Sequence, residues 1–491
     1  FSASRFVRSL TNQGNINQQI CNAEYAVRGK ILDKVNALKA LQKSDPKSVK
    51  FDDFLSCNIG NPQELGQKGI TYFRDVLGLT QMEHRINDSY ITDNFPKDTV
   101  SKAQSIVDSV PSTGAYTDSK GVEVIRDWVC DFIQQRDGGV RPSAENIYLT
   151  DGASPAARIW MNLLTRPNTP SDKHKDGMMI PIPQYPLYSA GLDMVGGHRV
   201  PYFLDEDNKW GLGREDLEKS YAEGVENGID VRGLVVINPG NPTGHCLTVQ
   251  QQREIVEFAA EKEIVLFADE VYQENIYQSE KPFQSFRKTV LDSKHADKIE
   301  LVSFHSVSKG FVGECGRRGA YMELHNISDE VQEQIVKSAS VNLCPNIDGQ
   351  IMVGLMVNPP KKGEESYALY KQESEDIIAS LKRRAVKLTT KLNELDGVSC
   401  ISAEGAMYAF PNITIPAKAV ETAEADNVPA DMFYCLALLE ETGIVVVPGS
   451  GFLQKEGTYH FRTTFLPSEA KMDAVIDLMS KFHKGFMQQW A

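Results

Sequence analysis

The stretch "GLVVINPGNPTGHCLTVQQQREIVEFAAEKEIVLFAD", residues 233–269, indicates the architecture of this chain. It contains two apolar runs, 233–238 and 263–269, on either side of a segment, 251–263, whose apolar residues recur at the 3.6-residue spacing of a helix. The two runs are apolar almost throughout, which is typical of strands that helices cover on both faces of a sheet. The stretch therefore predicts two strands and a covering helix of a doubly wound α/β fold.

Further short apolar runs, several of them also continuously apolar, occur at 146–151, 178–182, 198–203, 300–305 and 319–323. Together with the two runs above, they give seven candidate strands. We therefore predict a large domain that has a mainly parallel seven-stranded sheet with helices on both faces. A linker rich in Pro, Gly and charge, 357–366, separates this region from a long helical stretch, 377–395, and an α+β tail.

The composition excludes several classes of function. Fifty-two basic and 66 acidic residues give a net charge of −14 without a Lys- or Arg-rich block, which argues against nucleic acid and anionic membranes as partners. The eight cysteines and nine histidines show no metal-ligand spacing, so we predict reduced thiols and no metal site. No run of about eighteen apolar residues occurs, so no transmembrane helix is predicted. A length of 491 residues favours two domains.

Polar residues at the ends of the predicted strands are the candidates for chemistry, because ligands of open α/β sheets bind beyond the carboxyl ends of the strands. Asp269 ends one apolar run and Lys309 follows another. A carboxylate in such a position is costly unless it is paired, so Asp269 needs a cationic partner. Gly152, Ala153 and Ser154 lie between a strand and a helix, where free backbone N–H groups could hold a phosphate, although such turns also serve as plain helix caps.

Lys309 is surrounded in the sequence by groups that attract an anion, namely Ser306, Ser308, Arg317 and Arg318. Two cations beside an amine favour its neutral form, which is a nucleophile toward carbonyls. The alternative is a solvated surface lysine. A phosphate-bearing aldehyde satisfies the whole set, since pyridoxal phosphate needs an amine, phosphate donors, an anion opposite its pyridine nitrogen and an aromatic face. We therefore predict pyridoxal 5'-phosphate as the cofactor.

The motif "SVSKGFVGECGRRG", 306–319, resembles the cofactor-lysine motif of class I/II aminotransferases of fold type I. Four other motifs resemble the same family: "IPIPQYPLY" (180–188), "NPGNPTG" (238–244), "ADEVYQENIY" (268–277) and "HFRTTF" (460–465). The likeness extends from "AEYAVRG" (23–29) and "CNIGNPQ" (57–63) to the C-terminus. One such motif alone is only suggestive, but five in one chain at their expected places are specific.

The resemblance implies roles for particular residues. Lys309 would form the internal aldimine and shuttle a proton, Asp269 would keep the pyridine nitrogen protonated, and Tyr272 would tune the aldimine. The other implied cofactor contacts are Ala153, Ser154, Tyr185, Asn241, Ser306, Arg317 and, from a second subunit, Tyr116. The implied substrate contacts are Arg462, as a bidentate partner of the α-carboxylate, with Gly60, Asn241 and Tyr185.

The resemblance also implies an activity. The likeness is greatest to the branch of the family that exchanges an amino group between L-alanine and 2-oxoglutarate, giving pyruvate and L-glutamate by a ping-pong mechanism. A related transferase with another amino-acid donor, or with glyoxylate as acceptor, is the alternative, and a non-catalytic regulator that binds pyridoxal phosphate is a more distant one. The implied partners are amino acids, 2-oxo acids and a second copy of the chain, in a homodimer with shared active sites.

The expected domains are an N-terminal arm (1–22), a smaller α+β domain (23–99 and 351–491) and a large cofactor-binding domain (100–350). The arm carries Arg5 and Arg8 and begins without an acidic residue. That pattern suits an organelle transit peptide, and a flexible arm would look the same. The expectation for location therefore stays open between mitochondrial and cytoplasmic.

A few residues depart from the family pattern or have no assigned role. Leu453 stands where related enzymes have glycine, which leaves the shape of its loop open. Arg318 receives no role, because a guanidinium beside a phosphate site can simply balance charge. We interpret Tyr188 and Tyr277 as packing aromatics and His305 as a strand residue rather than a catalyst.

Overall fold

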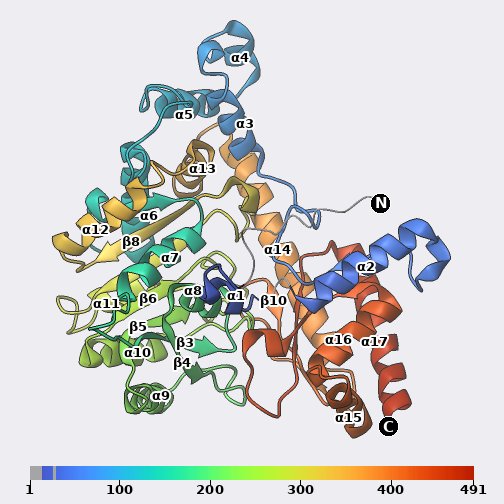
Figure 1. Cartoon of the computed structure of the whole chain (residues 1–491). Helices are drawn as coiled ribbons and strands as arrows, with labels where there is room; N and C mark the ends of the chain where they lie inside the picture. Colours follow the sequence, from blue (N-terminus) through green and yellow to red (C-terminus); the bar gives the residue numbers. More distant parts are fainter. Residues whose placement is uncertain (1–13, 26–28) are drawn as a thin grey trace, which may run out of the picture.

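The computed structural model describes residues 14–25 and 29–491 (Figure 1). Most of the expected N-terminal arm, with Arg5 and Arg8, lies outside the described residues. Within the described ranges, no helix is both long and apolar enough to cross a membrane. The same ranges contain no group of three or more His, Cys, Asp or Glu side chains that could hold a metal ion.

The larger part of the molecule is built on a seven-stranded sheet with the strand order β2-β8-β7-β6-β5-β3-β4. The strands are β2 (Ile147–Thr150), β3 (Asp176–Ile182), β4 (His198–Phe203), β5 (Asp230–Ile237), β6 (Val265–Asp269), β7 (Leu301–Ser306) and β8 (Ala320–His325). Strand β8 is antiparallel to β2 and β7, and the other neighbours are parallel. Every strand predicted from an apolar run is present, so the predicted α/β fold is confirmed.

Helices cover both faces of this sheet, as the continuous apolar runs predict. On β6, Leu266 and Ala268 pack with one set of helices, whereas Val265 and Phe267 pack with the other. The first set is α9 (Arg214–Glu226), α10 (Val249–Lys262) and α11 (Phe286–Leu291). The second set is α7 (Ala153–Leu164), α8 (Leu187–Val195) and α12 (Asp329–Ser340). Because both faces are dry, polar groups can reach solvent only at the strand ends.

The predicted covering helix 251–263 corresponds to α10, and its ends have local causes. The Thr248 side chain accepts a hydrogen bond from the Gln251 backbone while the Gln251 side chain accepts one from the Thr248 backbone, which is a capping box. At the other end Glu263 adopts the left-handed conformation (φ 54°) that terminates many helices. The chain is thereby turned directly into β6.

The smaller part brings both ends of the chain together. One hydrophobic cluster is formed by buried side chains from three stretches of the chain, which lie within residues 31–57, 271–277 and 381–486. In Figure 1 the blue helix α2 (Lys30–Ser44) lies beside the red helix α16 (Ala430–Thr442), and α17 (Glu469–Trp490) packs against both α16 and the orange helix α14 (Tyr367–Leu392). Strand β1 (Leu55–Ser56) pairs in parallel with β12 (Ile444–Val445), and a second sheet has the order β10 (Tyr408–Ala409), β14 (Phe461–Thr464), β13 (Val447–Pro448).

The segment 70–99 packs differently from our expectation that all of 23–99 joins the smaller domain. Phe73 of α3 (Thr71–Thr80) and Ile106 of α5 (Lys97–Val107) share a cluster with Ile125 of α6 (Glu123–Asp137) and Ile351 of α13 (Ile347–Val357). These helices belong to the larger part. The apolar faces of α3 and α5 are buried there because α6 and α13 offer an apolar surface at the edge of the sheet.

Candidate active site

A cavity of about 530 Å³ opens at the carboxyl ends of the central strands, where the larger and smaller parts meet. Ten of the twelve predicted site residues line it: Gly60, Ala153, Ser154, Tyr185, Asn241, Asp269, Tyr272, Ser306, Lys309 and Arg462. Residues without a predicted role also line it, among them Tyr25, Ser308, Cys315, Arg318 and Tyr408. The predicted residues that do not line the cavity are Arg317 and Tyr116.

Asp269 is the last residue of β6, and its carboxyl group is buried. The hydroxyl of Tyr188 donates to its Oδ2 at 2.7 Å, and the Val271 N–H donates to its Oδ1 at 3.4 Å. Burial raises the pKa of Asp269, whereas these two hydrogen bonds and the charge of Lys309 act in the opposite direction. Tyr188 is therefore more than the packing aromatic that we expected, because it binds the carboxyl group that the cavity presents.

Lys309 lies just beyond the end of β7, in the turn that follows the strand. Its Nζ donates to the Gly60 carbonyl at 2.8 Å and lies 5.7 Å from the centre of the Tyr272 ring. A Cβ atom on Gly60 would lie 3.0 Å from Nζ and would clash with the Tyr408 hydroxyl. Glycine at position 60 therefore gives the amine room to move within the cavity.

Tyr408 contributes a phenol to the cavity from β10 of the smaller part. The Tyr272 hydroxyl donates to the Tyr408 hydroxyl at 3.3 Å, and Asn241 Nδ2 approaches the Tyr272 hydroxyl at 3.5 Å. Burial opposes ionisation of Tyr408, but the positive charges of Lys309 and Arg462 outweigh it, so the pKa of Tyr408 lies below its usual value. Burial and Tyr408 together hold the pKa of Tyr272 well above its usual value, which suits a phenol that donates.

The anion-binding end of the cavity lies at the start of α7. Ala153 and Ser154 begin this helix, and Gly152 before it has φ 98°. A Cβ atom on Gly152 would clash with the Arg318 guanidinium. The guanidinium thus lies against the helix start, where backbone N–H groups and the helix dipole attract an anion.

Arg317 does not reach this end of the cavity, which contradicts the predicted phosphate contact. Its Nη1 lies 3.1 Å from Asp348 Oδ2, and it lines a separate hollow beside Glu314 and Arg74. The next residue, Arg318, has φ 55° and leaves the helical turn in the left-handed conformation. This reversal sends two consecutive arginines to different places, and Arg318 is the one in the cavity.

Arg462 lies on β14 of the smaller part, and its side chain is buried. It lines the cavity together with Lys309 and Asp269 of the larger part. Its Nη1 donates to Asn241 Oδ1 at 3.0 Å, and its Nη2 donates to the Asn58 carbonyl. The guanidinium carbon lies 4.2 Å from the centre of the Tyr408 ring and 4.8 Å from that of Phe452. Its Nε has no hydrogen-bond partner in the described part of the chain. A buried guanidinium with an unused donor is suited to a carboxylate ligand.

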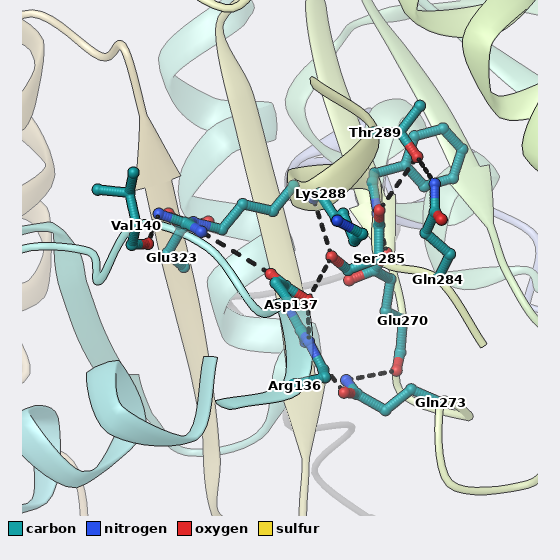
Figure 2. Close-up of polar contacts among 12 residues, drawn as sticks. Arg136, Asp137, Val140, Glu270, Gln273, Gln284, Ser285, Lys288, Thr289 and Glu323 are labelled. Atoms are coloured by element: carbon teal, nitrogen blue, oxygen red, sulfur yellow. Dashed lines mark hydrogen bonds and ion pairs between the residues drawn. The ribbon is translucent and has the colours of Figure 1, made fainter. Parts of the chain in front are cut away.

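A buried ionic network holds the turn that follows Asp269, through contacts with Glu270 and Gln273 (Figure 2). Arg136 binds Asp137 with two hydrogen bonds, at 2.7 and 2.9 Å, and donates to Gln273 Oε1 at 3.0 Å. Gln273 in turn donates to the Glu270 carbonyl at 3.2 Å, and Ser285 donates to Asp137 Oδ1 at 2.8 Å. The backbone that carries Asp269 and Tyr272 is thereby tied to α6 and to the start of α11.

Several other predicted residues are placed as follows. Tyr116 is 76% exposed and outside the cavity of its own chain. Leu453 has φ 58°, the left-handed conformation that favours glycine, which explains why glycine suits this position. Tyr277 donates to the Ala406 carbonyl at 2.6 Å within a hydrophobic cluster, and His305 stacks on Phe132, so both are packing residues as expected.

Sequence reasoning missed Tyr408 and Tyr188, and it expected Arg317 in the cavity, which Arg318 lines instead. Tyr408 stands in "EGAMYAFP" (404–411), where no neighbouring residue indicates chemistry. Tyr188 stands three residues after Tyr185 in "PQYPLY" (183–188), and this short separation from a predicted site residue was the available signal that Tyr188 lies near the site. Its role became visible only because Asp269, 81 residues away, lies beside it.

This arrangement suits a ligand that carries an aldehyde and an anionic group, together with a carboxylate. The larger part contributes the Lys309 amine, the Asp269 carboxyl group and the start of α7 to the cavity, and the smaller part contributes Arg462. The profile of the family "Aminotransferase class I and II" matches residues 86–478. The chain is 49% identical over 484 residues to "Probable alanine aminotransferase, mitochondrial" of Dictyostelium discoideum, covering 97% of this chain and 89% of that protein. It is 44% identical over 481 residues to "Glutamate--glyoxylate aminotransferase 2" of Arabidopsis thaliana, covering 97% and 96%.

The fold comparison agrees. The structure of "Alanine aminotransferase from Pyrococcus furiosus" superposes with a TM-score of 0.74 over 96% of this chain and all of that one, at 23% identity, and shares its fold. The chain belongs to the class I and II aminotransferases.

Enzymes of this family use pyridoxal 5'-phosphate, and the residues of the cavity fit that group. A lysine amine, a buried carboxyl group and an aromatic side chain, Tyr185, line one cavity with the helix start at Ala153. Gly60 and Gly152 keep open the space that a side chain would fill. Each part of the cofactor therefore has a chemically matching group: its aldehyde, its ring nitrogen, its ring face and its phosphate.

Proposed function

We propose that this protein transfers the amino group between L-alanine and 2-oxoglutarate, giving pyruvate and L-glutamate. The observation that carries the proposal is that Lys309, Asp269 and Arg462 converge on one cavity. The name of the D. discoideum relative supports alanine as a substrate. The name of the A. thaliana relative favours a second candidate, in which glyoxylate is the acceptor.

Each reacting group of a substrate amino acid has a proposed partner in the chain. When bound, pyridoxal phosphate withdraws electrons from the substrate Cα, which makes the proton there removable. Lys309 supplies the amine that holds the cofactor, and once released this amine takes the Cα proton and returns it elsewhere on the conjugated system. Arg462 binds the α-carboxylate through donors that include its unused Nε, and so orients the Cα–H bond.

The remaining residues hold the cofactor in register. Asp269 would pair as an anion with its ring nitrogen, and Tyr185 would supply an aromatic face for its ring. Tyr272 and Asn241 would bind its phenolic oxygen. The phosphate would be bound by the start of α7, by Ser306 and by a guanidinium, which we assign to Arg318 because Arg317 is paired with Asp348 outside the cavity.

We further propose a homodimer with shared sites, in which Tyr116 of one chain reaches the phosphate in the other. Its exposure of 76% supports this role, since an exposed tyrosine outside its own cavity is available to a second chain. The substrates are amino acids and 2-oxo acids, as the family implies. A mitochondrial or cytoplasmic location is in line with the name of the D. discoideum relative.

The test is a half-reaction screen. The loaded enzyme is mixed with each standard amino acid without an acceptor, and the oxo acid released is measured against the amount of enzyme. We expect one equivalent of pyruvate from L-alanine and of 2-oxoglutarate from L-glutamate, with slow reaction of aspartate and aromatic amino acids. If tyrosine or aspartate were the best donor, the alanine assignment would fail. Titrating the aminated enzyme with glyoxylate and with 2-oxoglutarate then separates the two candidate functions.

A further inference from the structure

One tyrosine, Tyr188, donates a hydrogen bond to the carboxyl group of Asp269, which we place opposite the cofactor's ring nitrogen. Tyr188 lies on α8, is 2% exposed, and donates from its hydroxyl to Asp269 Oδ2 at 2.7 Å. Among the described residues, no other side chain donates a hydrogen bond to Asp269, and the Val271 N–H at 3.4 Å is a long contact. The ring of Tyr188 belongs to the hydrophobic cluster that contains Trp160 and Phe267.

The surroundings give this hydrogen bond unusual weight. Asp269 is buried, and burial disfavours its charged form. The bond from Tyr188 is the largest influence that favours the charged form, ahead of Val271 and of Lys309. A hydrogen bond to an ionised acceptor in a low-dielectric site is roughly twice as strong as one between neutral groups. Tyr188 therefore supplies the main contact within the chain that favours an ionised Asp269.

We propose that Tyr188 is a positioning residue of the reaction, whose hydroxyl keeps Asp269 ionised and oriented and thereby keeps the cofactor's ring nitrogen protonated. This inference rests on the proposed role of Asp269. Without the hydroxyl, the carboxyl group takes up a proton in its apolar surroundings and no longer stabilises a cationic ring nitrogen. The ring then withdraws electrons less strongly from the substrate.

The position of Tyr188 also couples two sides of the cofactor. The Tyr188 N–H donates to the Tyr185 carbonyl at 3.3 Å, so one tight turn carries both tyrosines. Tyr185 lines the cavity, whereas Tyr188 does not line it and reaches Asp269, which does, through its hydroxyl. The turn that places an aromatic face against the ring therefore also sets the charge at the ring nitrogen.

The experiment replaces Tyr188 by phenylalanine in the full-length enzyme, which keeps the packing and removes one oxygen. Tyr202→Phe is the matched control, because Tyr202 is equally buried and donates at 2.7 Å to the Val235 carbonyl, without contact to Asp269. The first readout is the ¹⁵N NMR shift of the ring nitrogen in enzyme loaded with ¹⁵N-labelled pyridoxal phosphate. We expect the protonated signal in the parent and in Tyr202→Phe, and a shift toward the neutral signal in Tyr188→Phe.

The second readout separates kcat from KM. In Tyr188→Phe we expect kcat to fall by roughly ten- to a hundredfold, the scale of one hydrogen bond to a charged group, while the KM for alanine stays within about threefold because Arg462 is untouched. Cofactor with a methylated ring nitrogen, whose charge is fixed, should give parent and variant similar rates. A ¹⁵N shift in Tyr188→Phe identical to that of the parent would overturn the proposal.

Two further measurements keep these outcomes distinct. If Asp269→Asn also leaves the ¹⁵N shift unchanged, the proposed role of Asp269 fails, rather than its control by Tyr188. If Tyr188→Phe does not fold, as judged by circular dichroism and Tm, a fluorinated tyrosine at position 188 keeps the shape and makes the hydroxyl a stronger donor. A ¹⁵N shift that does not respond to that replacement would equally overturn the inference.

Discussion

The hydroxyl of Tyr408 lies 3.3 Å from that of Tyr272. The two residues come from different parts of the molecule, because Tyr272 follows β6 of the large sheet and Tyr408 lies on β10 of the smaller part. The same Tyr408 ring lies 4.2 Å beneath the guanidinium carbon of Arg462, and its hydroxyl occupies the space that a side chain on residue 60 would need. This phenol therefore links Tyr272 of the larger part to Arg462 of the smaller part within the cavity.

The contact between residue 60 and Tyr408 predicts a coupled pair of substitutions. Gly60→Ala should lower kcat/KM by about a hundredfold, because the new Cβ clashes with the Tyr408 hydroxyl. Tyr408→Phe removes that oxygen, so the double variant should recover part of the loss although each single change is harmful. Gly78→Ala, in α3 with no atom within 4 Å of the added carbon, is the control. Strictly additive losses in kcat/KM would show that the two positions do not interact.

The two adjacent arginines should differ in their effect on the cofactor. Arg318→Ala should weaken binding of pyridoxal phosphate by roughly ten- to a hundredfold, since it removes a charged donor from the anion-binding end of the cavity. Arg317→Ala should change the affinity by less than about threefold, because it breaks a partly exposed ion pair with Asp348. Fluorescence titration of the cofactor-free protein measures both constants, and the reverse order would restore Arg317 as the phosphate ligand.

Replacing the lysine should separate binding from turnover. Lys309→Ala should still bind pyridoxal phosphate, because the other contacts remain, but should lose transamination by several orders of magnitude. Equilibrium dialysis measures the binding, and a coupled assay of pyruvate formation measures the rate. Near-normal multiple-turnover rates in this variant would remove Lys309 from the mechanism.

The buried network of Figure 2 predicts a dependence of stability on pH. Burial raises the pKa of Glu270 to about 8, and the Phe286 N–H donates to its Oε1 at 2.7 Å. The folded state therefore binds this proton more tightly than the unfolded state, in which the pKa of glutamate is about 4.3. The contribution of Glu270 is fully present below that value and is lost as the pH rises to about 8.

Glu270→Gln should remove this contribution, because glutamine keeps the acceptor for Phe286 and cannot ionise. Between pH 5 and pH 9 the unfolding free energy of the parent should fall by about 4 kcal/mol relative to that of the variant. Urea unfolding at both pH values measures the difference. Glu257→Gln, at a partly exposed carboxylate on α10, serves as the control, and an equal pH slope in the parent and in Glu270→Gln would contradict the prediction.

Mixed dimers test the shared site. A Lys309→Ala chain and a Tyr116→Ala chain, each first shown to be impaired, are mixed under conditions that exchange subunits. If Tyr116 acts across the interface, one site of each mixed dimer holds both the intact lysine and the intact tyrosine, so activity should recover. If activity stays as low as in the two impaired variants despite demonstrated exchange, Tyr116 acts within its own site or lies outside the mechanism.

Much of the fold could be read directly from the chain. Seven apolar runs predicted the seven strands of the sheet, because a strand that helices cover on both faces is apolar along most of its length, as β6 is. The division of the helices was harder to predict. Residues 70–99 pack on the larger part. This could not be predicted, because the apolar face of α3 indicates that the helix is buried but does not indicate which element covers it.

The sequence by itself determined two chemical groups that follow or end apolar runs, the amine of Lys309 and the carboxyl group of Asp269, and the family resemblance of "HFRTTF" (460–465) added the guanidinium of Arg462. Local spacing is sufficient for this, since each residue follows an apolar run or stands in a recognisable motif. Only the tertiary structure decided which of the two adjacent arginines, 317 or 318, faces the cavity. It also decided that Tyr188 and Tyr408 belong to the site. Their partners lie 81 and 136 residues away along the chain, and contacts at such separations are set by how sheet and helices pack rather than by local pattern.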